Sequence, residues 1–193
     1  MSAIIAIIIA YLLGSLSSAI LLAKAFNWPD PRTLGSGNAG ATNVLRTLGK
    51  KQAAFVLTGD VLKGLIAVWV GYLFHVSAFM LGMVGLAAVV GHIYPLYFGF
   101  KGGKGVATAV GATFGLSFIS GILMAAAWAV IVFLTRYASL ASIIAVALAP
   151  VFLLLFSKAA FFIPSALIAA LIIWKHKENI DRLKSNTENK VEF

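Results

Sequence analysis

The chain has 193 residues, of which 61% are hydrophobic and only 11% are charged. Such a chain has too few polar residues to cover a water-soluble surface, so the composition excludes an ordinary soluble domain. It contains no cysteine, which excludes disulfides, a thiolate nucleophile and cysteine metal ligands. The formal charge of +9 is typical of basic loops that orient a membrane protein, and we predict no nucleic-acid partner.

Continuously apolar runs cover residues 2–23, 53–74 and 138–156, each close to the roughly 20 residues that a helix needs to cross a bilayer. Strand-type alternation is absent from the sequence, so helices are the predicted spanning form. The run 106–134 is too long for one ordinary helix and too short for two full ones. Its weakest helical stretch contains Gly115, Ser117, Ser120 and Gly121, which predicts a tight turn between two short helices.

The charge distribution favours this hairpin. With it, the chain has seven spans, only Lys158 lies outside, and Lys63 falls within a span, whereas a single span at 106–134 would leave basic residues on both sides. The positive-inside rule therefore predicts an all-α integral membrane protein, a seven-span helical bundle with its amino terminus outside and its carboxy terminus inside. The residues predicted inside are Lys24, Arg32, Arg46, Lys50, Lys51, Lys101, Lys104, Arg136, Lys175, Lys177, Arg182, Lys184 and Lys190.

The whole chain, residues 1–193, is predicted to form a single membrane-embedded domain. Its tail, residues 185–193, is polar and lacks helical periodicity, which predicts a flexible segment. Trp28, Trp69, Trp128 and Trp174 lie near predicted span ends, a position typical of interface anchors.

Three polar motifs lie on the predicted inner side. The first combines glycines, small hydrogen-bonding residues and a cation: Gly35, Ser36, Gly37, Asn38, Gly40, Thr42, Asn43 and Arg46. Glycines let backbone N–H groups approach an anion, and hydroxyl and amide side chains add neutral donors. A simple glycine-rich turn would require neither the two asparagines nor the arginine. This composition predicts a phosphate cradle.

The second motif alternates glycine with lysine where a span begins, at Lys101, Gly102, Gly103 and Lys104. A helix amino terminus beside ammonium groups is a strong anion site. The pattern is not a nucleotide P-loop, because Phe98 replaces its first glycine and no strand precedes it. His92, at the end of the preceding span, either faces the same polar pocket or is a hydrogen-bonded structural residue.

The third motif follows the last span and contains His176, Asn179 and Arg182. Its cations could serve only to stop translocation, but its histidine and asparagine have no such role. Within the second span, Asp60 and Lys63 are three residues apart and can pair on one helical face. Two roles are open for this pair: it organises the site from below, or it clamps two helices.

Together these motifs resemble the three signature motifs of the bacterial acyl-phosphate:glycerol-3-phosphate acyltransferase family, the PlsY type. The resemblance implies transfer of a fatty acyl group from acyl phosphate to the 1-hydroxyl of glycerol 3-phosphate, which gives lysophosphatidic acid and phosphate, the first acylation step of phospholipid synthesis. It implies acyl phosphate, glycerol 3-phosphate and membrane lipid as partners, with no cofactor and no metal. A monomer is compatible with it. The expected location is the bacterial inner membrane, with the site on the cytoplasmic side.

Acyl phosphate is already activated, so direct transfer needs positioning and charge stabilisation rather than a covalent enzyme intermediate. The predicted catalytic residues are Ser36, Arg46, His92, Lys104 and Asn179. The predicted substrate-binding residues are Gly35, Gly37, Asn38, Thr42, Asn43, Lys101, Gly102, Gly103, His176 and Arg182. The base that takes the proton of the 1-hydroxyl is either His92 or the phosphate of glycerol 3-phosphate itself.

Two alternatives to this mechanism and function have weaker support. Ser36 as a nucleophile is disfavoured, because no nucleophile elbow surrounds it. The competing class is a transporter of a phosphorylated metabolite, which would place its cations near the midplane on broken helices. The enzyme hypothesis requires Arg46, Lys104 and Asn179 to meet in one pocket.

Overall fold

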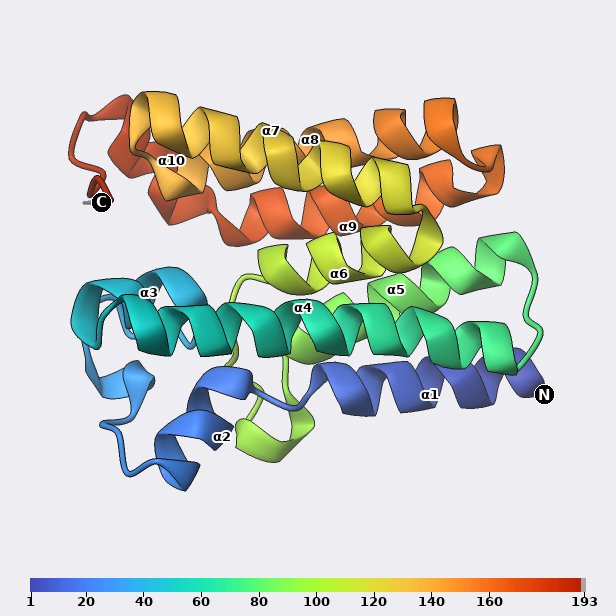
Figure 1. Ribbon diagram of the computed structural model, residues 1–193, viewed down its shortest axis with the longest axis horizontal. Coiled ribbons are helices and arrows are strands. Elements are labelled where there is room, and N and C mark those ends of the chain that lie inside the picture. The colour runs from blue at the N-terminus through green and yellow to red at the C-terminus, as the bar shows by residue number, and fades with distance from the viewer. Residues whose placement is uncertain (192–193) are drawn as a thin grey trace.

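The computed structural model describes residues 1–191, within which every regular element is a helix. The elements are α1 (Ser2–Gly14), α2 (Ser18–Ala25), η1 (Pro31–Thr33), α3 (Ala41–Thr47), α4 (Lys50–Leu73), α5 (Ala78–Ile93), η2 (Leu96–Phe98), α6 (Val106–Leu116), α7 (Phe118–Thr135), α8 (Ala138–Phe156), η3 (Ala159–Phe161), α9 (Phe162–Lys175) and α10 (Lys177–Lys184). The long helices run nearly parallel to one axis, and the two termini lie at opposite ends of it (Figure 1). The predicted all-α class is confirmed.

Several helices are long and apolar enough to cross a membrane. Four qualify alone: α4, α5 with its η2 extension, α7 and α8. Two bent pairs, α1 with α2 and α9 with α10, could each form one further span. Large apolar side chains such as Phe133 and Leu134 point outward, as expected for surfaces that face lipid. The α6 helix is too short to qualify, so the count of seven spans and their orientation stay predictions.

The hairpin within 106–134 is present. α6 ends at Leu116 and α7 begins at Phe118, so Ser117 alone forms the break. Its backbone is extended, and its Oγ accepts a hydrogen bond from the Ser120 N–H at 3.3 Å, which caps the start of α7. α7 then runs back over α6 (Figure 1). The break therefore falls within the stretch that the sequence marks as weakly helical.

The first apolar run is not one continuous helix, because residues 2–23 fall in α1 and α2, which meet at a 48° bend; that the pair forms one span stays a prediction. At the bend, Ser15 Oγ donates to the Tyr11 carbonyl at 2.8 Å, a bond that competes with regular helix geometry. Buried Lys63 of α4 donates to the Leu16 carbonyl at 2.8 Å. The carbonyl that the bend frees is thus satisfied inside the bundle, as a membrane interior requires.

Small residues bring α4 and α6 into close contact. A Cβ atom on Gly64 would overlap the Thr108 carbonyl, and one on Gly111 would overlap the Val61 carbonyl. Such close approach through glycine is common between membrane helices, where van der Waals packing holds the bundle together. It places the first half of α6 against the middle of α4.

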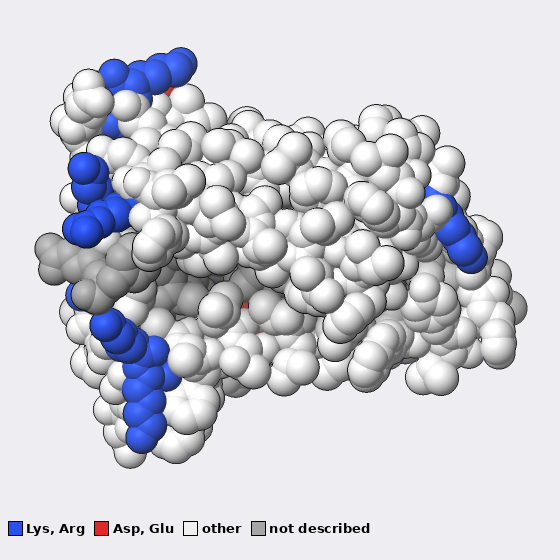
Figure 2. Space-filling model, turned by 45° about the horizontal axis from the view of Figure 1, so that its top comes forward, with Lys and Arg blue, Asp and Glu red and all other residues white. Residues whose placement is uncertain are grey.

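Basic side chains gather at one end of the molecule. This end carries α2, α3 and α10, and a smaller basic group lies at the opposite end (Figures 1 and 2). The tail follows α10 at this basic end and folds back onto the bundle, where Glu188 and Val191 are buried. Val191 N donates to the Arg136 carbonyl at 2.8 Å. The sequence did not predict these contacts; the mobility of the tail stays a prediction, and its last two positions lie outside the described residues.

Candidate active site

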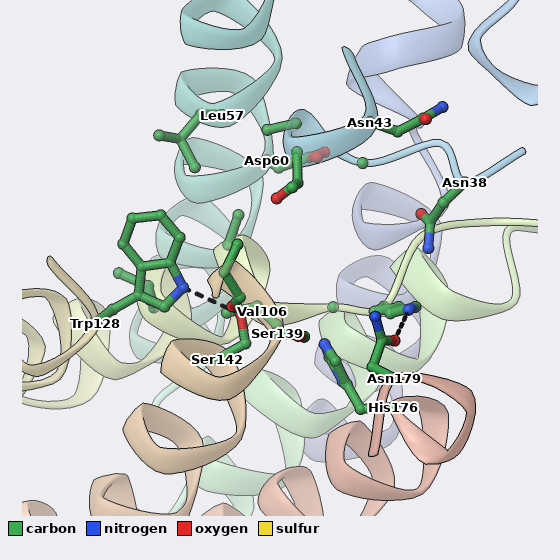
Figure 3. A pocket seen from close by; sticks show the side chains of 18 of the residues that line it. Asn38, Asn43, Leu57, Asp60, Val106, Trp128, Ser139, Ser142, His176 and Asn179 are labelled. Carbon is green, nitrogen blue, oxygen red and sulfur yellow. Dashed lines mark hydrogen bonds between the residues drawn. The ribbon is translucent and has the colours of Figure 1, made fainter. Parts of the chain in front are cut away.

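A cavity of about 390 Å³ opens between the helices at the basic end. Figure 3 shows Asn38, His176 and Asn179 on one side of it, and Leu57 and Trp128 on the other. Arg46, Lys104 and Arg182 also line the cavity, whose wall therefore combines a polar, cationic part with an apolar part. This combination suits a ligand with a charged head and a hydrocarbon tail.

Residues of all three motifs line this cavity. Arg46 from α3, Lys104 from the loop before α6 and Asn179 from α10 meet there, as the enzyme hypothesis requires. The predicted site residues in its wall are Ser36, Asn38, Thr42, Asn43, Arg46, His92, Lys104, His176, Asn179 and Arg182. Their catalytic and binding roles stay predictions.

A smaller polar cavity of about 250 Å³ adjoins the first. Gly37, Gly102 and Gly103 line it, together with Ser36, Asn38 and Lys104, which line both cavities. Two predicted residues line neither cavity: Gly35, whose φ of +54° shapes the first loop, and Lys101, which is exposed. The two cavities thus share Lys104 in their walls.

Asn43 holds the first motif in shape. Its Nδ2 donates to the carbonyls of Pro31 at 2.9 Å and Leu34 at 3.0 Å. Its Oδ1 accepts from the backbone N–H of Ser36 at 3.0 Å and from Ser36 Oγ at 3.2 Å. These contacts use both donors and both lone pairs of the amide. The geometry therefore favours a role for Asn43 in positioning Ser36 over direct contact with a ligand.

The second motif packs directly on His92. The N–H groups of Gly102 and Gly103 donate to the carbonyls of Ile93 at 3.3 Å and His92 at 3.2 Å. A Cβ atom on Gly102 would overlap the His92 carbonyl, and one on Gly103 would overlap the imidazole. The glycines are thus required for close backbone approach, which places Lys104 at the junction of the two cavities.

The third motif contacts Lys104 directly and is held in place by a carboxylate that the sequence did not single out. Lys104 Nζ donates to Asn179 Oδ1, and Asn179 Nδ2 donates to Glu188 Oε1 at 2.8 Å. Arg182 Nε and Ser139 Oγ donate to the same carboxylate at 2.7 Å and 2.9 Å. Burial opposes the ionised form, but the hydrogen bonds from Asn179, Arg182 and Ser139 outweigh it and hold the pKa of Glu188 below its usual value.

Two further groups have shifted ionisation. Burial lowers the pKa of His176 to about 4, and the nearby Lys104 ammonium contributes in the same direction. At neutral pH its imidazole is therefore uncharged, and Nδ1, 2.7 Å from the Ile172 carbonyl, carries the proton. Burial and the neighbouring Arg182 also lower the pKa of Lys104. In residues 1–191, no group of three His, Asp or Glu side chains could hold a metal ion.

Asn38 presents a free acceptor to both cavities. Its Oδ1 is buried and has no hydrogen-bond partner among the described residues. Since a buried polar atom without a partner costs about 1–3 kcal/mol, a ligand hydroxyl is a fitting donor for it. This supports the predicted binding role of Asn38.

The apolar side of the cavity was not predicted as part of the site. Its wall includes Leu57, Val61, Val110, Phe114, Ala125 and Trp128. Trp128 was expected as an interface anchor, but its Nε1 donates to Ser142 Oγ at 3.0 Å inside the cavity wall. Apolar residues in a membrane helix look alike whether they face lipid or a ligand, so the sequence carried no signal for this part.

The comparisons with known proteins agree with this geometry. A sequence model described as "Glycerol-3-phosphate acyltransferase" matches residues 4–186. This chain belongs to the glycerol-3-phosphate acyltransferase family. A protein of that name from Coxiella burnetii is 50% identical over 193 residues, which cover all of both chains.

Two solved structures of family members match the fold. They are crystal structures of PlsY (YgiH), described as an integral membrane glycerol 3-phosphate acyltransferase, in a glycerol 3-phosphate form and a lysophosphatidic acid form. Both are 42% identical to this chain and cover all of it and 96% of their own length, with TM-scores of 0.92 and 0.91. The chain is thus an integral membrane acyltransferase.

Proposed function

We propose that this acyltransferase moves a fatty acyl group from an acyl phosphate to the 1-hydroxyl of glycerol 3-phosphate. The products are lysophosphatidic acid and inorganic phosphate. The observation that carries the proposal is the half-apolar, half-cationic cavity that shares Lys104 with a second polar cavity. The two related crystal structures are named for glycerol 3-phosphate and lysophosphatidic acid, an acceptor and a product that support the same reaction.

The chemistry of the products assigns the two cavities. Lysophosphatidic acid has both a hydrocarbon tail and a phosphate, so it fits the large cavity, with its tail along Trp128 and its phosphate near Arg46 and Arg182. The released phosphate has no tail and fits the small polar cavity, where Gly102 and Gly103 form part of the wall and Lys104, Lys175 and Lys177 supply positive charge. Lys104 lies between the two phosphates.

The reaction is a direct transfer. The 1-hydroxyl oxygen of the acceptor bonds to the acyl carbonyl carbon, and the bond from that carbon to the phosphate oxygen breaks, with its electron pair leaving on the phosphate. Lys104 lines both cavities, where its ammonium stabilises the charge that develops on the carbonyl oxygen and the leaving group. Asn179, which accepts from Lys104, fixes the direction of this ammonium.

Ser36 serves as a hydrogen-bond donor in this mechanism rather than as a nucleophile. Its hydroxyl donates to an amide oxygen of Asn43, which cannot act as a base to activate it. The proton of the attacking 1-hydroxyl has two possible destinations, His92 and the phosphate of glycerol 3-phosphate. In the variant H92A, a loss of only a few-fold in rate would exclude His92 as the base, because general base catalysis contributes about 100- to 10,000-fold.

We place the enzyme in the bacterial inner membrane with its site at the cytoplasmic face. The basic end of the molecule carries the cavities, and cytoplasmic loops of membrane proteins are enriched in Lys and Arg (Figure 2). Glycerol 3-phosphate is water-soluble and reaches the cavity from that side, whereas the donor's acyl chain enters from the lipid.

The test is phosphate release by the purified protein in detergent. With acyl phosphate and glycerol 3-phosphate together, we expect stoichiometric formation of phosphate and lysophosphatidic acid. Omission of either substrate, or an acyl thioester as donor, should abolish both products. Phosphate release without glycerol 3-phosphate would contradict acyl transfer to that acceptor. Uptake of glycerol 3-phosphate into liposomes without turnover would favour the transporter.

A further inference from the structure

Three titratable side chains are buried beside the cavity, two in the middle of α4 and one in the last turn of α5. Asp60 and Lys63 lie on α4 and His92 lies on α5, with 1%, 6% and 6% of their surfaces exposed. Ionisable groups inside a membrane bundle are costly to bury and point to a function. The direct transfer proposed above gives Asp60 and Lys63 no role.

The three side chains form a chain of contacts. Lys63 Nζ lies 2.9 Å from Asp60 Oδ1, and the same oxygen lies 3.5 Å from His92 Nδ1. Lys63 is fixed at its other side, because it donates to the Leu16 carbonyl at the bend between α1 and α2. Asp60 and His92 both line the large cavity, whereas Lys63 does not. Lys63 therefore fixes the Asp60 carboxylate on the side away from the cavity, and the carboxylate faces the His92 imidazole.

The imidazole in turn supports the loop that forms the small cavity. Gly103 lies against the His92 ring, and its N–H donates to the His92 carbonyl. The next residue, Lys104, is the cation at the junction of the two cavities. A rotation of the ring would move Gly103, and with it the direction of Lys104.

We propose that Asp60 is a positioning residue of this enzyme. It orients the His92 ring, and the ring holds the Gly102–Lys104 loop in the shape that seats the donor's phosphate. Lys63 supplies the counter-charge that fixes the carboxylate. This proposal rests on the proposed acyl-phosphate reaction, because the loop is assigned there to the phosphate that leaves.

A pair that only clamps helices would not require these features. The Asp60–Lys63 contact alone would suffice for a clamp, since both residues lie on α4 and Lys63 reaches Leu16. Instead, Asp60 Oδ1, which Lys63 already contacts at 2.9 Å, also lies 3.5 Å from His92 Nδ1, and this Nδ1 has no hydrogen-bond partner in residues 1–191. Hydrogen bonds of a site without substrate are often long and tighten when the substrate binds. Seating a phosphate on the loop would shorten this contact.

The main test removes both charges together. In D60N/K63Q no buried charge is left unpaired, and glutamine keeps a donor for the Leu16 carbonyl. Because a displacement of about 1 Å costs about 100-fold in rate, we expect kcat/KM for acyl phosphate to fall by that factor. The Ki of inorganic phosphate as product inhibitor should rise about 10-fold or more, since one lost hydrogen bond of 1.4 kcal/mol corresponds to tenfold. If the Asp60–Lys63 pair only clamps helices, kcat/KM and Ki should both equal those of the parent enzyme.

Two variants keep the test decisive. D60E preserves the ion pair with Lys63 but shifts the carboxylate relative to the imidazole. If Asp60 positions His92, kcat/KM should fall; if the pair only clamps helices, kcat/KM should not change. T113V removes a buried hydroxyl whose one hydrogen bond within residues 1–191 is to the Ala109 carbonyl, and it should leave kcat/KM and Ki at parent values.

A mutant cycle shows whether Asp60 acts through His92. Adding H92Q to D60N/K63Q should lower kcat/KM no further than H92Q alone, because residues that act through one another are not additive. Full additivity, or parent kinetics in D60N/K63Q or D60E, would overturn the proposal. A parent enzyme without turnover on acyl phosphate would instead overturn the proposed function.

Discussion

Glu188 offers the most specific prediction, because its carboxylate joins the third motif to the cavity wall. In E188Q the remaining carbonyl oxygen can still accept from Asn179 and Ser139, but an NH₂ group faces Arg182 Nε, which lies 2.7 Å from Oε2. One charge-assisted hydrogen bond is lost and two donors oppose one another. Arg182 and Asn179 both line the cavity, so we expect E188Q to bind the transition state more weakly.

The size of the expected loss in E188Q follows from the solvent exposure of Arg182 and Glu188. A hydrogen bond to a charged group contributes about 1.5–3 kcal/mol. The Arg182 side chain is 41% exposed, whereas that of Glu188 is 4% exposed, so water screens one partner and the lower part of this range applies. A loss of about 1.5–2 kcal/mol corresponds to about 10- to 30-fold in kcat/KM.

The assay is the initial rate of phosphate release with both substrates, alongside the thermal unfolding midpoint in detergent. D181N is the matched control, because Asp181 is an exposed acid on α10 and lines neither cavity. It should retain the parent kcat/KM. An E188Q enzyme that is folded and as active as the parent would refute the argument that Glu188 orients Arg182 and Asn179.

Four more predictions concern single side chains. K104M should lower kcat by about 100- to 1,000-fold, the effect of removing one oxyanion donor, whereas K158M, at the opposite end, should leave kcat unchanged. S36A should weaken activity, and mass spectrometry of the parent enzyme during turnover should detect no acylated protein, since an adduct would disprove direct transfer. A125W should raise KM for long-chain acyl phosphates more than for short ones, because Ala125 lines the apolar side of the cavity; an equal rise for both would argue against the tail's assigned path. The pKa of His176 is about 4, below 6.5 for the free side chain, so as the pH falls from 6.5 to 4 the unfolded chain takes up the proton first and stability decreases; H176N should flatten this slope in thermal unfolding.

The one-sided distribution of cations made the meeting of the three motifs predictable. Loops that share a membrane face lie near one another, and Arg46, Lys104 and Asn179 do line one cavity. The break near Ser117 was predictable because residues of low helix propensity interrupt an apolar run of the wrong length. Both predictions depend on local composition and on which side of the bilayer a loop occupies.

Contacts between distant segments were not predictable in this way. The bend in residues 2–23 depends on Lys63, which donates to the Leu16 carbonyl from another helix. Glu188 lies in a polar tail without periodicity, and only the fold reveals that it meets Ser139 and Asn179. Asn43 has the residue type of a ligand-binding side chain, but its four contacts within the first loop give it a positioning role.

The central claim is that two phosphates bind on opposite sides of Lys104 during acyl transfer. The most direct measurement is a crystal structure of the protein with lysophosphatidic acid and inorganic phosphate bound together. We expect the lipid phosphate beside Arg46 and Arg182, the acyl chain along Trp128, and inorganic phosphate against Gly102 and Gly103. A structure in which both phosphates occupy the same cavity, or in which the acyl chain avoids the apolar wall, would contradict the account.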